Sequence, residues 1–385
     1  MSEFRADPLF GNPCLIVPEK ATRPNRVRVT QASPRAQSVH LSHPLEDQLD
    51  YPGPCPYCPG NEAFSSPEIY RTQDLASAGP NRWQTRVFAH RHPAMKLEAP
   101  DLFTDLKALG HSEALSALLT SKPGFGVHEV IVESPNHNAP FWEMDVERSI
   151  QVFKTLQKRM SDLYQDRRLL YVQLFKNHQT AAGTHHEHPH FELLGMPFIP
   201  EPVMRLNSAR ECQVCEVLRK EEPDLMGQAN RSTQNERMST PPPRKKKADL
   251  SSRRAHSERF MTATTQFVAL MDYAPEYDYQ FSIYPSQHHS NFQDATEDEL
   301  RDLSRLVSQI FTRLNRLLGE FALNIVIFSA PNPLGFANPG SSSMHWFVRV
   351  YPRLIRKTGF EIATGIPVVR VAPEDAARAF REKEL

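Results

Sequence analysis

The 385-residue chain lacks several features that would assign it to a particular class of protein. No run of apolar residues approaches membrane-spanning length, and the first residues lack the basic-then-apolar pattern of a secretory signal peptide. The chain has no net charge, because 45 basic side chains balance 45 acidic ones. A general attraction to nucleic acid or to anionic membranes is therefore not indicated. We expect a cytoplasmic protein that binds neither a membrane nor nucleic acid.

Cysteine is also scarce, and the five cysteines are unevenly spaced. Cys14 stands alone in a short apolar run, where it is expected to be a small buried side chain. The other four form two Cys-x-x-Cys pairs, Cys55/Cys58 and Cys212/Cys215. In a reducing compartment such pairs are more often metal ligands than disulfides. Free thiols are the alternative.

Histidine, in contrast, is concentrated in one stretch. A predicted strand at residues 171–175 leads through a glycine-bearing segment to His186, His188 and His190, at every second position. Alternate side chains of an extended strand share a face, so all three imidazoles are predicted to point the same way. This density favours metal binding or nucleophilic chemistry over a solvated strand that has histidines by accident.

The order of elements is repeated in the two halves of the chain, residues 1–205 and 206–385. Each half reads as a Cys-x-x-Cys turn, a strand, a proline followed by a histidine, a helix, a strand and a histidine-bearing strand. The first helix is predicted to begin after Asp145. The second is predicted to begin with a capping box of Thr296 and Glu299 and to end at Gly319. We predict an α+β fold of two tandem units, with antiparallel sheets and packed helices.

Residues from about 226 to 260 interrupt the second half. They include the basic run 244–247 and few apolar side chains, so they cannot bury a core and are predicted to form a disordered insertion. A nuclear-localisation or nucleic-acid-binding tag is the alternative, although composition favours a solvated linker.

Each half also supplies two thiols and two histidines, the ligand set of a structural tetrahedral zinc site. The predicted ligands are Cys55, Cys58, His137 and His188 in the first half, and Cys212, Cys215, His288 and His345 as a second candidate site. The halves differ two residues beyond the last ligand, where the first has His190 and the second has Phe347. Because a neutral imidazole is a competent nucleophile, we predict that His190 is catalytic and that the second half is a structural copy.

Short motifs along nearly the whole chain, apart from the insertion, carry a resemblance to a known family. They are Arg5-x-Asp7-Pro8-Leu9-x-Gly11, Cys55-Pro-Tyr-Cys58-Pro-Gly-Asn-Glu62, Gly126-x-His128-Glu129-Val130, Ser134-Pro135-x-His137, Phe175-x-Asn177 with Ala182-Gly183, His188-Pro189-His190, His345-Trp346 and Gly359-Phe360-Glu361. Together they resemble the galactose-1-phosphate uridylyltransferase family of the histidine-triad superfamily.

The resemblance implies two histidine-triad-like units and ping-pong nucleotidyl transfer in carbohydrate metabolism. His190 would take a nucleoside monophosphate from a nucleotide sugar and pass it to a hexose 1-phosphate. In the family the carbonyl oxygen of the residue corresponding to Pro189 orients the nucleophile, and zinc at His188 would hold the strand. Positions matched to nucleotide or phosphate contacts are Arg23, His90, Arg91, Asn177, Gly183, Thr184, His185 and Glu192. A homodimer is expected because relatives are often dimers.

Several residues depart from the family pattern. Glu192 replaces a glutamine that donates to the nucleotide phosphate, and a carboxylate about 4 Å from a phosphate is repelled by about 1 kcal/mol even in bulk water. Glu192 must therefore be protonated, turned away or paired with a cation, and burial would raise its pKa. His185 replaces a serine and offers such a cation. His90 replaces an asparagine, and Phe347 replaces a histidine of the last strand.

Three alternative functions are open at this point. One is a phosphorylase that passes the nucleotide from an ADP-sugar or a dinucleoside polyphosphate to inorganic phosphate. The second is a zinc-stabilised nucleotide-binding protein that has lost catalysis through Glu192. Nucleic-acid binding is the third and is less favoured, because the chain lacks aromatic interleaving and an overall positive charge.

Overall fold

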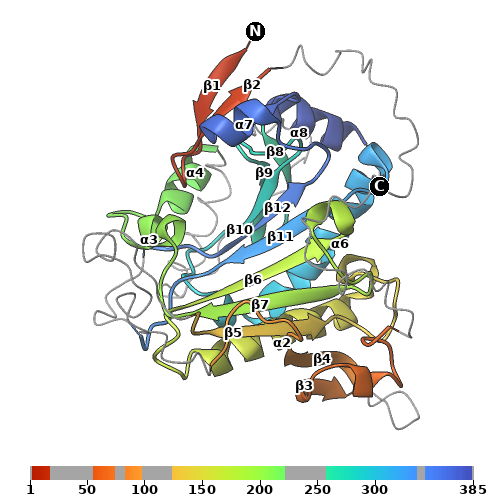
Figure 1. Ribbon diagram of the computed structural model, residues 1–385. Helices are drawn as coiled ribbons and strands as arrows, with labels where there is room; N and C mark the ends of the chain where they lie inside the picture. Colours follow the sequence, from red (N-terminus) through yellow and green to blue (C-terminus); the bar gives the residue numbers. More distant parts are fainter. Residues whose placement is uncertain are drawn as a thin grey trace, which may run out of the picture.

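The protein is described by a computed structural model that covers residues 2–17, 55–73, 83–97, 124–221, 257–335 and 343–383. Within these residues a ten-stranded sheet forms the centre of the fold (Figure 1). Its strands, in spatial order, are β3 (Glu68–Gln73), β4 (Trp83–Ala89), β5 (Val127–Val132), β7 (His190–Met196), β6 (Tyr171–His178), β11 (Leu323–Phe328), β12 (Phe347–Pro352), β10 (Phe281–Pro285), β9 (Phe267–Met271) and β8 (Phe260–Ala263). All of its pairings are antiparallel, which confirms the predicted α+β fold.

In the described part of the chain each half contributes five strands, and from the centre of the sheet outward both halves place them in the same order: the fourth, fifth, third, second and first strand of that half. The first half runs β6-β7-β5-β4-β3 and the second runs β11-β12-β10-β9-β8. The two halves join through β6 and β11, where Asn177 lies opposite Asn324. This mirrored order supports an internal duplication, although the two halves share one continuous sheet. The division at residue 205 stays a prediction.

Two long helices, α2 (Val146–Leu163) and α6 (Glu297–Leu318), pack against one face of this sheet. Asp145 caps α2 by accepting from the backbone N–H of Arg148. Thr296 and Glu299 form the predicted capping box of α6, which ends at Gly319 as expected. The other helices in the described ranges are α3 (Glu201–Asn207), α4 (Gln213–Glu221), α7 (Gly359–Thr364) and α8 (Pro373–Glu382), with short 3-10 helices η3 (Glu62–Phe64), η4 (Phe141–Glu143), η5 (Thr180–Ala182) and η7 (Phe292–Asp294).

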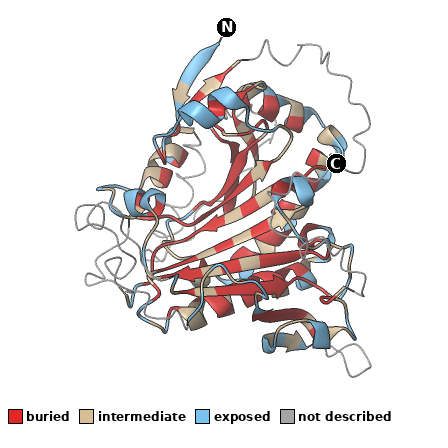
Figure 2. Ribbon diagram, in the orientation of Figure 1, coloured by how far each residue is buried: buried red, intermediate tan, exposed pale blue. Residues whose placement is uncertain are grey.

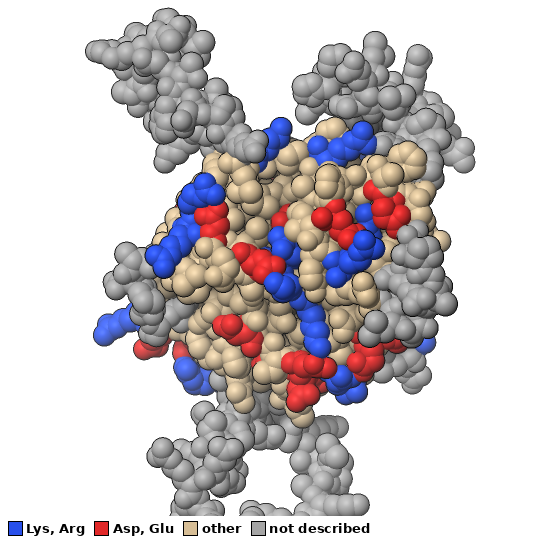
Figure 3. Space-filling view, turned by 90° about the horizontal axis from the view of Figure 1, so that it is seen from below, with Lys and Arg blue, Asp and Glu red and all other residues tan. Residues whose placement is uncertain are grey.

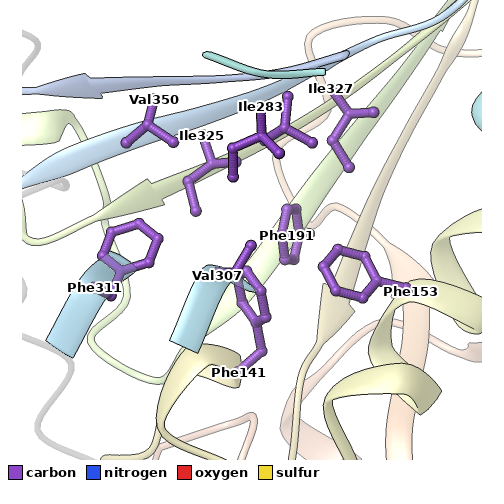
Figure 4. A pocket seen from close by; sticks show the side chains of 10 residues that line it. Phe141, Phe153, Phe191, Ile283, Val307, Phe311, Ile325, Ile327 and Val350 are labelled. Atoms are coloured by element: carbon purple, nitrogen blue, oxygen red, sulfur yellow. The ribbon is translucent and has the colours of Figure 1, made fainter. Parts of the chain in front are cut away.

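The main core lies between the sheet and these two helices, and the central strands are buried along most of their length (Figure 2). Figure 4 shows a small void within it, lined by residues that include Phe141, Phe191 and Phe311. Its volume is about 10 Å³ and its lining is wholly apolar. A water molecule there would have no polar partner, so the void is expected to be dry.

The N-terminal residues belong to the first half of the sequence but pack on residues of the second half. Strand β1 (Glu3–Ala6) pairs with β2 (Pro13–Ile16), and β2 pairs in parallel with β13 (Val368–Val369). Arg5 pairs with Glu374 at 2.8 Å, and buried Arg349 reaches Asp7 at 3.2 Å. Cys14 is fully buried in this region, as predicted.

The structure corrects the predicted histidine-bearing strand. Strand β7 begins at His190, so His186 and His188 precede it rather than lying along it. Pro189 has no N–H that could donate to a neighbouring strand, so it cannot take part fully in a strand ladder. Its carbonyl accepts a hydrogen bond from the backbone N–H of Glu133 at 3.2 Å. In the second half, β12 likewise begins at Phe347, so His345 precedes the strand that was predicted to carry it.

The surface seen from below carries basic and acidic side chains interspersed (Figure 3). This pattern matches the balanced composition of the chain. Among the described residues, no helix is both long and apolar enough to cross a membrane.

Candidate active site and metal centres

The first predicted metal-ligand set comes together in the structure. Cys55 and Cys58 lie in a tight turn, with the backbone N–H of Cys58 bonded to the carbonyl of Cys55 at 3.2 Å. His137 follows β5, and His188 directly precedes the proline before β7. The ligand atoms of these four residues lie within 4.8 Å of one another.

The distances within this first cluster fit a zinc ion. The Cys58 Sγ lies 3.3 Å from His137 Nδ1 and 3.5 Å from His188 Nδ1, and the Cys55 Sγ lies 3.8 Å from His188 Nδ1. Typical zinc–sulfur and zinc–nitrogen bonds in a tetrahedron separate the two ligand atoms by roughly 3.5 Å. The second nitrogen of His188 faces the Ser134 carbonyl at 2.8 Å. That contact places the proton on Nε2 and leaves Nδ1 free to bind a metal.

The second predicted set is assembled in the same way. Cys215 Sγ lies 3.4 Å from His288 Nδ1 and 3.5 Å from His345 Nδ1, and Cys212 completes the group. In the described part of the chain, Nε2 of His345 is buried without a hydrogen-bond partner, unlike Nε2 of His188. The two clusters therefore share donor atoms but differ in how their last histidine is held.

His190 lies beside the first cluster at the start of β7. Its side chain is 5% exposed, and its Nδ1 lies 2.8 Å from the carbonyl oxygen of His188. Because a carbonyl can only accept, Nδ1 carries the proton and Nε2 keeps its lone pair. Burial lowers the pKa of His190 to about 4. The imidazole is therefore neutral near pH 7, as a nucleophile requires.

This contact corrects the predicted role of Pro189. The carbonyl that orients His190 belongs to His188, whereas the Pro189 carbonyl accepts from the Glu133 N–H. The residue that offers metal-ligand geometry thus also holds the proposed nucleophile through its backbone.

Strand alternation places the polar residues of the site on one face. His190 and Glu192 of β7 point away from Phe191 and Leu193, which belong to the core beneath α2 and α6. On β6, Asn177 donates from Nδ2 to Glu192 Oε1 at 3.3 Å. Glu192 Oε1 also lies 3.9 Å from His190 Nε2.

Glu192 pairs with His128, for which no role was predicted. Nε2 of His128, on β5, lies 2.8 Å from Glu192 Oε2. Burial raises the pKa of Glu192, but the His128 hydrogen bond and the neighbouring imidazoles lower it by more, so the net shift is downward. Burial raises the pKa as expected but is outweighed by these partners, and the paired residue is His128 rather than His185, which is exposed. His128 stands in a motif that the sequence comparison already used, but only the fold brings it to Glu192.

The other residues predicted to contact nucleotide or phosphate differ in how close they lie to the Glu192–His128 pair. The His90 ring stacks on His128 with centroids 4.1 Å apart, while Arg91 is exposed. Gly183 ends η5 in the left-handed region with φ 90°, and the Thr184 hydroxyl donates to the His186 carbonyl at 2.9 Å. Arg23 lies outside the described residues.

Two features near these residues were not predicted. Tyr57, between Cys55 and Cys58, places its ring 4.5 Å from that of His186 and 5.4 Å from that of His190. This contact gives His186 a packing partner. A pocket of about 380 Å³ borders η5 and is lined by Ala181, Tyr277, Arg353, Leu354, Ile355, Arg356 and Lys357.

Comparisons with known proteins show which family the chain resembles. The family model for the "Galactose-1-phosphate uridyl transferase, N-terminal domain" matches residues 1–200. An ADP-glucose phosphorylase of Arabidopsis thaliana is 25% identical, covering 100% of this chain and 93% of that protein. A galactose-1-phosphate uridylyltransferase of Thermotoga maritima is 24% identical, covering 80% of this chain and 86% of that protein.

Solved structures share the fold along the whole chain. The crystal structure of an ADP-glucose phosphorylase from Arabidopsis thaliana, with bound ADP-glucose, superposes with a TM-score of 0.71 at 23% identity, covering 100% of this chain and 99% of that one. A uridylyltransferase structure superposes with a TM-score of 0.62 at 17% identity, covering 99% and 98%.

The family match together with these relatives defines the chain as a nucleotidyltransferase enzyme. It belongs to the galactose-1-phosphate uridyl transferase family.

Proposed function

We propose that this enzyme moves a nucleoside monophosphate from a nucleotide sugar to a hexose 1-phosphate through a covalent His190–nucleotide intermediate. The observation that carries the proposal is the state of His190, a buried neutral imidazole with Nδ1–H held by a carbonyl and Nε2 unprotonated. Nε2 is free to attack a phosphorus atom on the same face as Glu192 and Asn177.

The transfer takes place in two displacements. Nε2 of His190 forms a bond to the α-phosphorus, and the bond to the sugar 1-phosphate breaks, with the electron pair leaving on the sugar phosphate. A phosphate oxygen of the acceptor then attacks the same phosphorus, and the P–N bond breaks to return neutral His190. The Nδ1–H contact to the His188 carbonyl stabilises the positive charge that develops on the imidazole ring in the intermediate.

Zinc is the metal proposed for the first Cys2His2 cluster, and the second cluster is a further candidate. Zinc there would supply no redox chemistry and would hold His188, whose carbonyl orients His190. The donor atoms and their spacing support this proposal. A cytoplasmic homodimer is proposed from the family resemblance, and light scattering on the purified protein tests the oligomeric state.

A second candidate acceptor is inorganic phosphate, which would make the enzyme a nucleotide-sugar phosphorylase. The similarity to the Arabidopsis thaliana ADP-glucose phosphorylase along the whole chain favours this candidate. The chemistry at His190 is the same for both acceptors, so the two differ only in the second displacement.

The test begins with nucleotide sugars labelled in the α-phosphate, with either uracil or adenine as the base. The proposal expects an acid-labile, base-stable label on the protein, abolished in His190→Ala. Chasing the labelled protein with hexose 1-phosphate or with inorganic phosphate then identifies the acceptor. A wild-type protein that takes no label from any nucleotide sugar would refute the proposal.

A further inference from the structure

Three residues beside the nucleophile form a cluster that the proposed chemistry does not yet use. The side chains of His90, His128 and Glu192 place one nitrogen or oxygen atom each within 4.8 Å of one another. The two imidazole rings are stacked with an interplanar angle of 4°. Two histidines and a carboxylate are a set that binds catalytic metals in other proteins, so a metal and a proton are the two candidates for what this cluster holds.

Backbone contacts decide between them by fixing the proton on each ring. The N–H of Ala94 points to His128 Nδ1 at 3.2 Å, and the N–H of His92 points to His90 Nδ1 at 3.0 Å. Both Nδ1 atoms therefore accept, and in the neutral rings both Nε2 atoms carry a proton. A metal bound at Nε2 would require a proton on Nδ1, facing another N–H. The cluster is therefore arranged to hold protons rather than a metal.

We propose that the His128–Glu192 pair takes up one proton when a nucleotide sugar binds at His190. The inference rests on the proposed function, because it requires a phosphate beside His190 Nε2. An attacking nitrogen must lie about 3–3.5 Å from the phosphorus. Glu192 Oε1 is 3.9 Å from the same nitrogen, so a phosphate oxygen comes within hydrogen-bonding range of this carboxylate.

The carboxylate is also held in place. Asn177 donates to Glu192 Oε1 at 3.3 Å and His128 contacts Oε2 at 2.8 Å. With a proton added to the pair, Glu192 donates to the phosphate through Oε1 while Oε2 still accepts from His128. A protonated Glu192 then makes the same kind of contact as the glutamine that is usual in the family.

The affinity for the nucleotide sugar depends on pH, and the groups that face Glu192 determine whether it rises or falls with pH. His128 on β5, His90 after β4, His190 on its own strand, His186 of the preceding loop and Tyr57 of the Cys-x-x-Cys turn are the titratable groups around it in the described residues. In the free protein burial raises the pKa of Glu192, but His128, His190 and His90 together lower it by more. A bound phosphate raises it. The affinity for the nucleotide sugar is therefore greatest at low pH. It falls as the pH rises from the pKa of Glu192 in the free protein to its higher pKa in the complex, by up to about tenfold per pH unit.

The experiment uses the full chain with His190→Asn, so that a bound nucleotide sugar is not cleaved. The phosphates of ADP-glucose and UDP-glucose are both diesters and do not titrate near neutral pH, so any proton comes from the protein. Calorimetry in buffers of different ionisation enthalpy measures the protons taken up per ligand, with an expected value of about one between the two pKa values. Binding affinity measured across the same pH range should fall as stated.

Replacing both members of the pair, by His128→Gln with Glu192→Gln, should bring proton uptake to near zero while binding is retained. Glu201→Gln is the matched control, because that carboxylate is 85% exposed and lies outside the site, and it should leave uptake unchanged. Uptake that persists in the double variant, or binding by the parent without uptake at any pH, overturns the proposal. A parent that binds no nucleotide sugar overturns the proposed function itself, which is a different result.

Discussion

Lys176 and Glu133 form a buried ion pair beneath His190, and removing one partner should strongly lower the free energy of unfolding. Both side chains are fully buried, and Lys176 Nζ donates to Glu133 Oε1. Lys176 also reaches the His190 carbonyl at 3.4 Å, from the face of the sheet opposite to the site. Burial lowers the pKa of Lys176 and raises that of Glu133, which shows that desolvation outweighs pairing for each group.

Lys176→Met should therefore destabilise the protein strongly, because it leaves a buried carboxylate without its cation. Removing one partner of a buried pair typically costs about 3–5 kcal/mol. Glu133 would keep only the Phe141 N–H, which now donates to its Oε2 at 2.9 Å. Urea unfolding followed by fluorescence measures the loss. In the folded variant, transfer activity should also fall, because the support of the His190 backbone is lost.

Two further variants test whether the unpaired Glu133 charge, rather than another effect of the substitution, causes the loss of stability in Lys176→Met. Lys176→Met with Glu133→Leu removes both charges and should recover most of the lost stability, since apolar replacements of buried pairs are often neutral or stabilising. Lys154→Met is the matched control. Its lysine pairs with Glu297 at 2.6 Å, but the two side chains are 37% and 54% exposed, so less than about 1 kcal/mol should be lost. A loss below about 1 kcal/mol for Lys176→Met, or a double variant less stable than the single one, would refute the reasoning.

Three other predictions follow from single features of the fold. Elemental analysis should find up to two zinc ions per chain, and Cys58→Ser should remove one of them together with transfer activity; unchanged metal content would exclude the first cluster as a zinc site. The Cys14 thiol is fully buried, and burial raises its pKa to about 12, so it should stay protonated at pH 8 and react with a thiol reagent only on unfolding. Mass spectrometry that finds Cys14 modified in the native protein would contradict this. Thr296→Ala should cost about 0.5–2 kcal/mol in urea unfolding, because it removes the capping box of α6, and an unchanged midpoint would show that the cap contributes nothing.

Local patterns in the sequence determined where the two long helices begin and where α6 ends. The caps at Asp145 and Thr296 and the end of α6 at Gly319 depend on side chains within a few residues of each helix end, so sequence reasoning found them. The two Cys2His2 sets were found because duplication repeats the same residue types in the same order. Their ligand atoms come together as predicted, although the metal assignment stays a proposal.

Contacts between distant strands were beyond the reach of sequence. The alternation of His186, His188 and His190 suggested one strand, but Pro189 cannot join a ladder, and β7 begins only at His190. Which carbonyl orients His190 also depends on how the chain turns at that proline. The structure selected His188.

The sequence by itself thus determined the α+β class, the duplicated order, the two thiol–imidazole sets and the residue that differs between the halves. Only the tertiary structure decided how the Glu192 carboxylate is accommodated beside His190. Its partner His128 lies 64 positions earlier in the chain and reaches it because β5 pairs with β7. A charge can be read from sequence, but the field that sets its pKa is the sum of groups that folding brings near, here three imidazoles and a desolvating sheet face.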